Sequence, residues 1–203
     1  MKLYYSTASP FVRKVSVVAL ETGLDGRIEK IATAVMPTKA NPALARENPL
    51  EKLPALETDG GEVIFDSVVI CEYLDSLHDG RKLFPPAGGA RWRALTLMSL
   101  ADGILDAGVL CRYEQLLRPE DKRNAEWVAG QARKVAQGLD ALETSADEFE
   151  REPTIGEITV GCALGWLEFR KPCGDSRAGR KRLFQWFDAI SRRPSFAATV
   201  PKA

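Results

Sequence analysis

Residues 48–74 read NPLEKLPALETDGGEVIFDSVVICEYL, and this stretch sets out a loop, a hairpin and a helix. Two short segments, residues 55–58 and 62–65, flank the sequence Asp59-Gly60-Gly61, which is typical of a tight turn between antiparallel strands. From Ser67 onward, apolar residues recur at the i, i+3, i+4 and i+7 spacing of an amphipathic helix: Ile70, Tyr73, Leu74 and Leu77. The stretch therefore predicts a hairpin followed directly by a helix.

The residues before this stretch predict a strand, a helix and a second strand. Residues 2–5 (KLYY) favour a short strand, and an apolar stripe that begins at Pro10 and closes at Gly23 favours a helix. Residues 27–32 (RIEKIA) are a second strand candidate, followed by a loop with room for a short helix. Residues 1–80 are therefore expected to mix strands and helices in one α/β domain.

A linker is expected next, because residues 80–89 (GRKLFPPAGG) hold two prolines and three glycines. Beyond it the pattern is helical throughout. We place the linker at residues 81–89, between a first domain of residues 1–80 and an all-helical domain of residues 90–203.

Four helices are expected in the second domain. The first two should cover approximately residues 90–117 and 120–149, and the last should end before Pro194. Another should begin at Thr154, where Thr-Ile-Gly-Glu fits a capping box in which the Thr154 and Glu157 side chains satisfy each other's backbone amides.

The composition argues against several classes of partner. Twenty-eight basic residues balance 28 acidic ones in a chain of 203, which disfavours nucleic acid or an anionic membrane as a partner. No apolar run approaches the roughly 18 residues of a membrane span. The N-terminus lacks the apolar stretch of a secretory signal, so we expect a cytoplasmic protein.

The cysteines and the histidine offer no metal site. Cys71, Cys111, Cys162 and Cys173 contain no CxxC pair, and His78 is the only histidine, so an ordinary zinc spacing is missing. Free cysteine is among the most buried residue types, and we interpret all four as reduced, buried thiols. We therefore expect no metal cofactor.

Each of the two clearest helices in the first domain has a polar residue just before its first position, in the pairs Ser9-Pro10 and Asp66-Ser67. Serine and aspartate are favoured N-caps, so one interpretation is that each pair does no more than begin its helix. The alternative is ligand binding. A hydroxyl at a helix N-terminus can stabilise a thiolate, and Ser67 beside Asp66 can hold the carboxylate and the ammonium of an amino acid.

The third segment is the loop NPLEKLP at residues 48–54. Its second proline, Pro54, removes an amide donor where a strand begins, which is tolerated at a first or edge position. A cis bond before Pro54 would leave the backbone groups of Leu53 facing outward, free to pair with a peptide ligand.

The order and spacing of these segments resemble those of the glutathione S-transferase superfamily. SPFVRK, NPLEKLP and FDSVVICEYL carry the resemblance in the first domain, and LADGILDAG, TIGEITVGCALGW and RRPSF continue it through the helical half. It covers the whole chain. It implies an α/β thioredoxin-like N-terminal domain with a mixed four-stranded sheet, followed by an all-α helical-bundle domain.

The resemblance also implies roles for single residues. Ser9 looks like the catalytic residue of serine-type transferases, where the hydroxyl donates a hydrogen bond to the glutathione sulfur. Leu53, ahead of a cis Pro54, would pair its backbone with the cysteinyl part of glutathione. Asp66 and Ser67 would bind the γ-glutamyl end.

Two lysines and two departures complete the expected site. Lys39 or Lys52 could reach the glycine carboxylate of glutathione, although each also fits a solvated surface lysine. The family often has glycine where this chain has Glu51, which adds a negative charge near an anionic ligand. The family usually has glutamate where this chain has Asp66, one methylene shorter.

The implied activity is that of a glutathione S-transferase, in which the thiolate of glutathione attacks an electrophilic small molecule in a detoxification reaction. Two alternatives remain open: a non-catalytic or regulatory relative that kept the fold, and a glutathione-dependent isomerase. A disulfide reductase is disfavoured, because it requires cysteine at position 9. We also expect a homodimer, in which the N-terminal domain contacts the partner's helix near residues 90–117.

Overall fold

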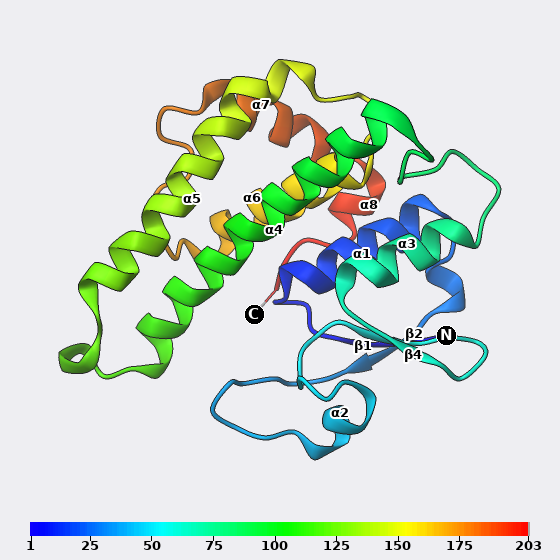
Figure 1. Cartoon of the computed structure of the whole chain (residues 1–203), viewed down its shortest axis with the longest axis horizontal. Helices are drawn as coiled ribbons and strands as arrows, with labels where there is room; N and C mark the ends of the chain where they lie inside the picture. Colours follow the sequence, from blue (N-terminus) through cyan, green and yellow to red (C-terminus); the bar gives the residue numbers. More distant parts are fainter. Residues whose placement is uncertain (203) are drawn as a thin grey trace. The chain divides into compact units, whose positions relative to one another are not determined.

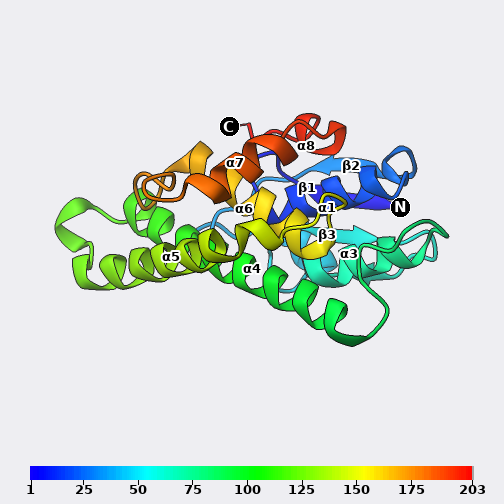
Figure 2. The same ribbon diagram turned by 90° about the horizontal axis from the view of Figure 1, so that it is seen from above.

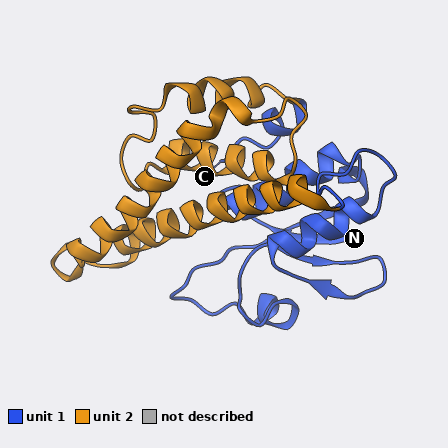
Figure 3. Ribbon diagram, turned by 45° about the horizontal axis from the view of Figure 1, so that its top comes forward, with its two compact units in different colours: residues 1–86, 194–203 blue, residues 87–193 orange. Residues whose placement is uncertain are grey.

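The computed structural model of the chain describes residues 1–202 and divides them into two compact units (Figure 1). The first unit comprises residues 1–86 and 194–202, and the second comprises residues 87–193 (Figure 3). A mixed sheet with helices forms the first unit and helices alone form the second, which confirms the predicted fold class.

The first unit is built on a sheet of four strands. In chain order its main elements are β1 (Lys2–Tyr5), α1 (Pro10–Glu21), β2 (Glu29–Ala32), α2 (Pro42–Glu47), β3 (Ala55–Glu57), β4 (Val63–Ile64) and α3 (Ser67–Ser76). The strand order is β2-β1-β3-β4, with β1 parallel to β2 and with β3 antiparallel to both β1 and β4. The predicted hairpin is thus β3–β4, in which Leu56 pairs with Ile64.

One face of this sheet carries the core of the unit. Helices α1 and α3 pack against each other on that face, whereas α2 lies beyond the opposite face (Figure 1). Leu3 and Leu56 from the sheet, Val15 from α1, and Ile70 and Leu74 from α3 are at most 1% exposed. Each such side chain contributes about 1.5–3 kcal/mol when it is buried. This core fixes where α1 and α3 begin relative to the strands.

The second unit consists of four longer helices, α4 (Gly88–Leu117), α5 (Ala125–Ser145), α6 (Ile155–Arg170) and α7 (Lys181–Ile190). Helix α4 packs against both α5 and α6 (Figure 2). The start of α6 approaches α4 very closely, because a Cβ atom placed on Gly156 would lie 2.8 Å from the Ala94 carbonyl oxygen. Glycine is required there by the contact between the helices.

The predicted capping box at the start of α6 is confirmed. The Thr154 side chain accepts from the Gly156 amide at 3.2 Å, and the Glu157 carboxylate accepts from the Thr154 amide at 2.9 Å. Both side chains are buried, so the first turn of this internal helix has its donors satisfied without water.

The helix expected at 120–149 is shorter than predicted. Helix α5 begins after Asn124, whose side chain accepts from the Trp127 amide at 3.0 Å, and the residues on either side form short 3-10 helices at Glu120–Lys122 and Ala146–Glu148. The hydrophobic spacing continues through these turns, but the asparagine cap starts the α-helix one turn later.

The end of the chain also differs from the expected division, because residues 194–202 group with the first unit. A short helix, α8 (Pro194–Ala197), packs against α1. The Arg13 side chain donates from Nη2 to the Phe196 carbonyl at 3.3 Å, and Thr7 Oγ1 donates to the Lys202 carbonyl at 3.2 Å. The final residues are therefore fixed along α1 by backbone and arginine contacts, for which the sequence carries no periodic signal.

Helix α4 is, within residues 1–202, the helix that is long and apolar enough to cross a membrane by length and composition. The expectation concerned an unbroken apolar run, and charged residues such as Asp102 and Asp106 interrupt this helix. The helix nevertheless packs against α5 and α6, and 44% of its most apolar window is buried. A core helix has the same composition, so this is weak support for a membrane span.

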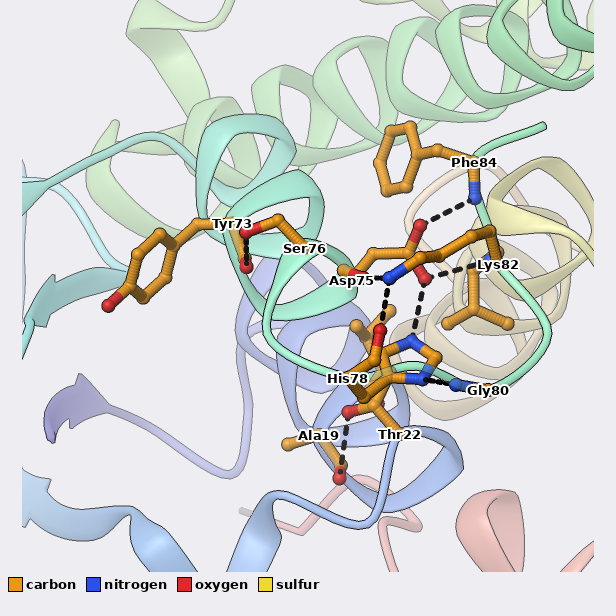
Figure 4. Close-up of polar contacts among 11 residues, drawn as sticks. Ala19, Thr22, Tyr73, Asp75, Ser76, His78, Gly80, Lys82 and Phe84 are labelled. Carbon is orange, nitrogen blue, oxygen red and sulfur yellow. Dashed lines mark hydrogen bonds and ion pairs between the residues drawn. The ribbon is translucent and has the colours of Figure 1, made fainter. Parts of the chain in front are cut away.

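The segment that leaves α3 is tightly held (Figure 4). The buried Asp75 carboxylate accepts from the backbone amides of Leu83 at 2.8 Å and Phe84 at 3.1 Å, and His78 Nε2 lies 3.0 Å from the same side chain. Lys82 Nζ donates to the Asp75 carbonyl at 2.6 Å and to the His78 carbonyl, at the negative end of the helix dipole. The first part of the predicted linker is thus anchored to α3.

Asp75→Ala should destabilise the protein strongly, because it leaves the two linker amides without an acceptor. Each unsatisfied buried donor costs about 1–3 kcal/mol, so we expect a loss of about 2–6 kcal/mol in the free energy of unfolding, measured by urea denaturation. Asp79→Ala, at an exposed position in the same segment, is the matched control. Equal stabilities for the two variants would contradict this role of Asp75.

Candidate functional site

The sheet topology brings the three predicted segments to one edge. Because β3 is antiparallel to both β1 and β4, the strands β1 and β4 end at the edge where β3 begins. Ser9 follows the end of β1, Leu53 precedes the start of β3, and Asp66 follows the end of β4. Residues far apart in the chain therefore meet where helices α1 and α3 begin.

Ser9 is the N-cap of α1. Its Oγ accepts from the Val12 amide at 3.3 Å, and its own amide donates to the Ser6 carbonyl at 3.2 Å. The cap uses an acceptor lone pair of the hydroxyl and leaves its proton available for another acceptor. The structural role of Ser9 is confirmed, and this role is compatible with donation of a hydrogen bond to a ligand.

The loop before β3 presents Leu53 to the same edge. The Leu53–Pro54 peptide bond is cis, as expected, and the register pairs between β1 and β3 stop at Ala55, so the backbone of Leu53 lies outside the sheet ladder. The Leu53 side chain is buried with Val12 of α1 and Leu44 of α2. Its side chain is thus part of the core, while its backbone sits at the end of the sheet.

A buried asparagine, which the sequence analysis did not single out, holds this loop together. Asn48 is 2% exposed, its Nδ2 donates to the Lys52 carbonyl at 2.9 Å, and its Oδ1 accepts from the Leu50 amide at 3.0 Å. Its backbone carbonyl accepts from the Glu51 amide at 2.8 Å. The Asn-Pro pair at the end of α2 is the sequence signal that could have identified it, since asparagine favours such turns.

The backbone at Glu51 adopts a conformation that favours glycine. Its φ angle is +51°, in the left-handed region where glycine is favoured. The Glu51 carboxylate accepts a hydrogen bond from the backbone amide of Asn41, the N-cap residue of α2. The negative charge expected near the ligand is therefore committed to a contact within the chain.

Asp66 and Ser67 occupy the start of α3. The N-cap is Asp66, whose Oδ1 accepts from the Val68 amide at 3.0 Å, while Ser67 is the first helical residue and is 3% exposed. Asp66 itself is exposed. The pair thus combines an accessible carboxylate with the positive end of a helix dipole, which suits a zwitterionic group.

The two lysines lie in loops of the same unit. Lys52 is exposed beside Leu53, and Lys39 is exposed in a turn where its amide donates to the Met36 carbonyl at 2.9 Å. Their role at the glycine carboxylate of glutathione stays a prediction.

Tyr4 carries another hydroxyl group of the first unit, and its environment disfavours the phenolate. Burial and the nearby Glu47 carboxylate raise the pKa of Tyr4 above its usual value. Its ring packs beside the cluster of Val12, Leu44 and Leu53. Tyr4 therefore supports the loop rather than competing with Ser9 as an acid at neutral pH.

Among residues 1–202, no group of three or more histidine, cysteine, aspartate or glutamate side chains could hold a metal ion. All four cysteines are free thiols. Three are buried as expected, but Cys173 is partly exposed.

Comparisons with known proteins agree on one family. The model of the glutathione S-transferase N-terminal domain matches residues 8–77, and that of the C-terminal domain matches residues 125–189. The uncharacterised GST-like protein YibF of Escherichia coli is 35% identical over 99% of this chain and 98% of its own. A glutathione transferase family member of Pseudomonas fluorescens, solved with bound glutathione, is 45% identical, covers 100% of this chain and 99% of its own, and has a TM-score of 0.97. A second structure from the same organism, with bound S-(propanoic acid)-glutathione, is 44% identical over 100% of both chains, with a TM-score of 0.92.

The left-handed backbone at position 51 leads to a comparison of two variants. Glu51→Ala loses the bond to Asn41 and keeps a Cβ atom in the left-handed region, whereas Glu51→Gly loses the bond but relieves the backbone. We expect Glu51→Gly to be about 1 kcal/mol more stable than Glu51→Ala by urea unfolding. An alanine variant as stable as the glycine variant would show that position 51 tolerates a side chain at no cost.

Proposed function

The chain belongs to the glutathione S-transferase family, and on this premise we propose that it binds glutathione and transfers it to an electrophilic small molecule. The observation that carries the proposal is the meeting of Ser9, Leu53 and Asp66 at one edge of the sheet. These three positions supply a donor for a sulfur, a free stretch of backbone and a carboxylate for an ammonium. A γ-glutamyl tripeptide with a central cysteine offers the matching groups: a sulfur, a peptide backbone and an ammonium.

The ligands of two similar proteins support this choice of co-substrate. One Pseudomonas fluorescens relative was solved with glutathione, and the other structure holds a glutathione whose sulfur carries a propanoic acid group. A sulfur bound to carbon is what a transferase leaves on glutathione. The second structure therefore favours a site with space beyond the sulfur over a site that only stores the tripeptide.

The charged ends of glutathione would be held by residues of the first unit. Asp66 would pair with the γ-glutamyl ammonium, and the Ser67 amide and hydroxyl, at the start of α3, would hold the adjoining carboxylate. The backbone of Leu53 would pair with the cysteinyl residue as an added strand does. Lys52 or Lys39 would approach the glycine carboxylate.

Ser9 would favour the thiolate of the bound glutathione. A free thiol with a pKa near 8.5 is about 3% ionised at pH 7, and lowering that pKa by about two units requires roughly 2.7 kcal/mol. One hydrogen bond to a charged acceptor contributes about 1.5–3 kcal/mol, and the positive end of α1 adds to it. A single hydroxyl at this helix terminus is therefore of the right strength, and Ser9 acts as a donor, not as a nucleophile.

Two other functions fit the same fold. A non-catalytic or regulatory relative would bind glutathione weakly or not at all, so retention on immobilised glutathione disfavours it. A glutathione-dependent isomerase would return its glutathione unchanged, so consumption of glutathione distinguishes the transferase. A panel of electrophiles assayed with glutathione tests both alternatives together.

We also propose a cytoplasmic homodimer with a detoxification role. Large apolar side chains remain exposed on α4, with Trp92 at 66% and Leu116 at 52%. Contact with a second copy would cover such residues, and α4 is the helix expected to meet the partner's N-terminal domain.

Ser9→Ala should reduce turnover far more than glutathione affinity, because the tripeptide keeps its contacts at both ends. The loss of about 1.5–3 kcal/mol predicts a rate about 10- to 150-fold lower near neutral pH. The thiolate is the reactive form, so a raised thiol pKa makes the variant slowest at low pH and partly rescues it at high pH.

Two variants control this measurement of the pH–rate profile. Ser9→Thr keeps both the cap and the donor and should retain most activity, and Ser6→Ala removes a neighbouring hydroxyl and should have little effect. A wild-type rate for Ser9→Ala at pH 6.5 would reduce Ser9 to a helix cap.

Asp66→Asn should weaken glutathione binding while the helix cap is kept, since asparagine caps as well as aspartate. Loss of the charge pair should raise the Kd by about tenfold or more in calorimetric titrations. Glu62→Gln, at an exposed position in the preceding hairpin, is the control. An unchanged Kd in Asp66→Asn would remove this residue from the site.

The homodimer predicts a sedimentation mass of twice the chain at micromolar concentration. Trp92→Glu, which places a charge on the exposed part of α4, should shift the protein toward the monomer. A monomeric wild-type protein over the whole concentration range would overturn the dimer without touching the proposed chemistry.

A further inference from the structure

In the helical unit, the turn that follows α6 packs against one face of α4. The Gln115 side chain donates from Nε2 to the Pro172 carbonyl at 3.0 Å. A Cβ atom placed on Gly108 would lie 3.6 Å from Cγ of the same proline. Gly108, Cys111 and Gln115 follow one another at the i, i+3, i+7 spacing of a single helix face. The residue after Pro172 is therefore held beside Cys111.

That residue is Cys173, which lies beside the Cys111 position of α4. The contacts of Pro172 with the Gly108 and Gln115 positions place Cys173 on the turn of α4 that carries Cys111, and the Cys111 thiol contributes to the raised pKa of Cys173. Cys111 is fully buried on α4, and its Sγ lies 3.7 Å from the Val128 carbonyl oxygen, whereas Cys173 is partly exposed. The buried thiol of Cys111 is thus a neighbour of the partly exposed thiol of Cys173.

A small cavity leads to the accessible thiol. It measures about 160 Å³, and Cys173 lines it together with Asp175, Ser176 and Arg180. A cavity of this size has room for several water-sized molecules. A small polar oxidant such as hydrogen peroxide can therefore reach the Cys173 sulfur.

From this arrangement we propose that Cys111 and Cys173 are a redox-sensitive pair that forms an intramolecular disulfide on exposure to hydrogen peroxide. The Cys173 thiolate attacks one peroxide oxygen and breaks the O–O bond, which yields a sulfenic acid and, after protonation, one water. The Cys111 sulfur then attacks the Cys173 sulfur and displaces the hydroxyl group as a second water. Two thiols and one peroxide give one disulfide and two waters, so the sulfurs are oxidised and the peroxide is reduced.

The surroundings of the pair set the rate of this reaction. Burial and the neighbouring Cys111 thiol raise the pKa of Cys173 to about 12, so its reactive thiolate is scarce at neutral pH. The pair should stay reduced in the absence of oxidant. Its oxidation should speed up by about tenfold for each unit of pH between 6.5 and 8.5, as the thiolate fraction rises.

The bond would tie the turn to α4 and close a long loop of chain. The turn contains two residues with left-handed backbone, Lys171 at φ 47° and Gly174 at φ 84°, on either side of the cysteine. Linking it to α4 restricts the unfolded chain, so oxidation should raise the thermal midpoint by several degrees.

The test uses the wild-type protein, and therefore does not depend on a variant that folds. The protein is treated with hydrogen peroxide at pH 8.5, unreacted thiols are blocked, and the digest is analysed by mass spectrometry with and without reduction. We expect the four thiols to fall to two, with one linked peptide pair that joins Cys111 to Cys173.

Controls separate this pair from the other cysteines. Cys71→Ser or Cys162→Ser should still form the bond, whereas Cys173→Ser should keep all three remaining thiols and show no shift in the thermal midpoint. Four unreacted thiols, an over-oxidised Cys173 with free Cys111, or a different linkage would overturn the proposal. None of these outcomes bears on glutathione binding, which belongs to the other unit.

Discussion

The placement of β3, antiparallel between two strands that run the same way, is the constraint on which the rest of the structure depends. It brings the end of β1, the start of β3 and the end of β4 to one edge of the sheet. Helices α1 and α3 begin at that edge, so two helix N-termini face the same region. Two positive helix ends beside an exposed stretch of backbone favour an anionic peptide-like ligand and a thiolate within it.

The loop before β3 shows how local contacts preserve this arrangement. Asn48 satisfies its buried amide entirely within the loop, and Glu51 closes the loop onto Asn41 at the start of α2. The side chain of Leu53 is then buried against α1 and α2, which leaves its backbone at the sheet edge. The core thus determines the position of a backbone segment that would bind ligand. A change in the loop would therefore shift the Leu53 backbone.

The elements that local chemistry specifies were predictable from the sequence, and those that depend on distant contacts were not. Turn residues and periodicity identified the hairpin and α3, and Thr154 with Glu157 identified the start of α6. The cis bond before Pro54 followed from the family resemblance. The partner of Glu51, the early end of α5 and the attachment of residues 194–202 to α1 depend on tertiary hydrogen bonds and caps, which no spacing reveals. The same limit applies to Lys39 and Lys52, whose role depends on a ligand.

We propose that this site stabilises the thiolate of bound glutathione, and the ionisation of that thiol is the direct test. Thiolates absorb ultraviolet light more strongly than thiols, so a pH titration of the complex against free protein reports the pKa of the bound sulfur. Stabilisation by Ser9 and the N-terminus of α1 predicts an apparent pKa of about 6.5–7, roughly 1.5–2 units below the free value near 8.5. A bound thiol that titrates at or above the free value would contradict it.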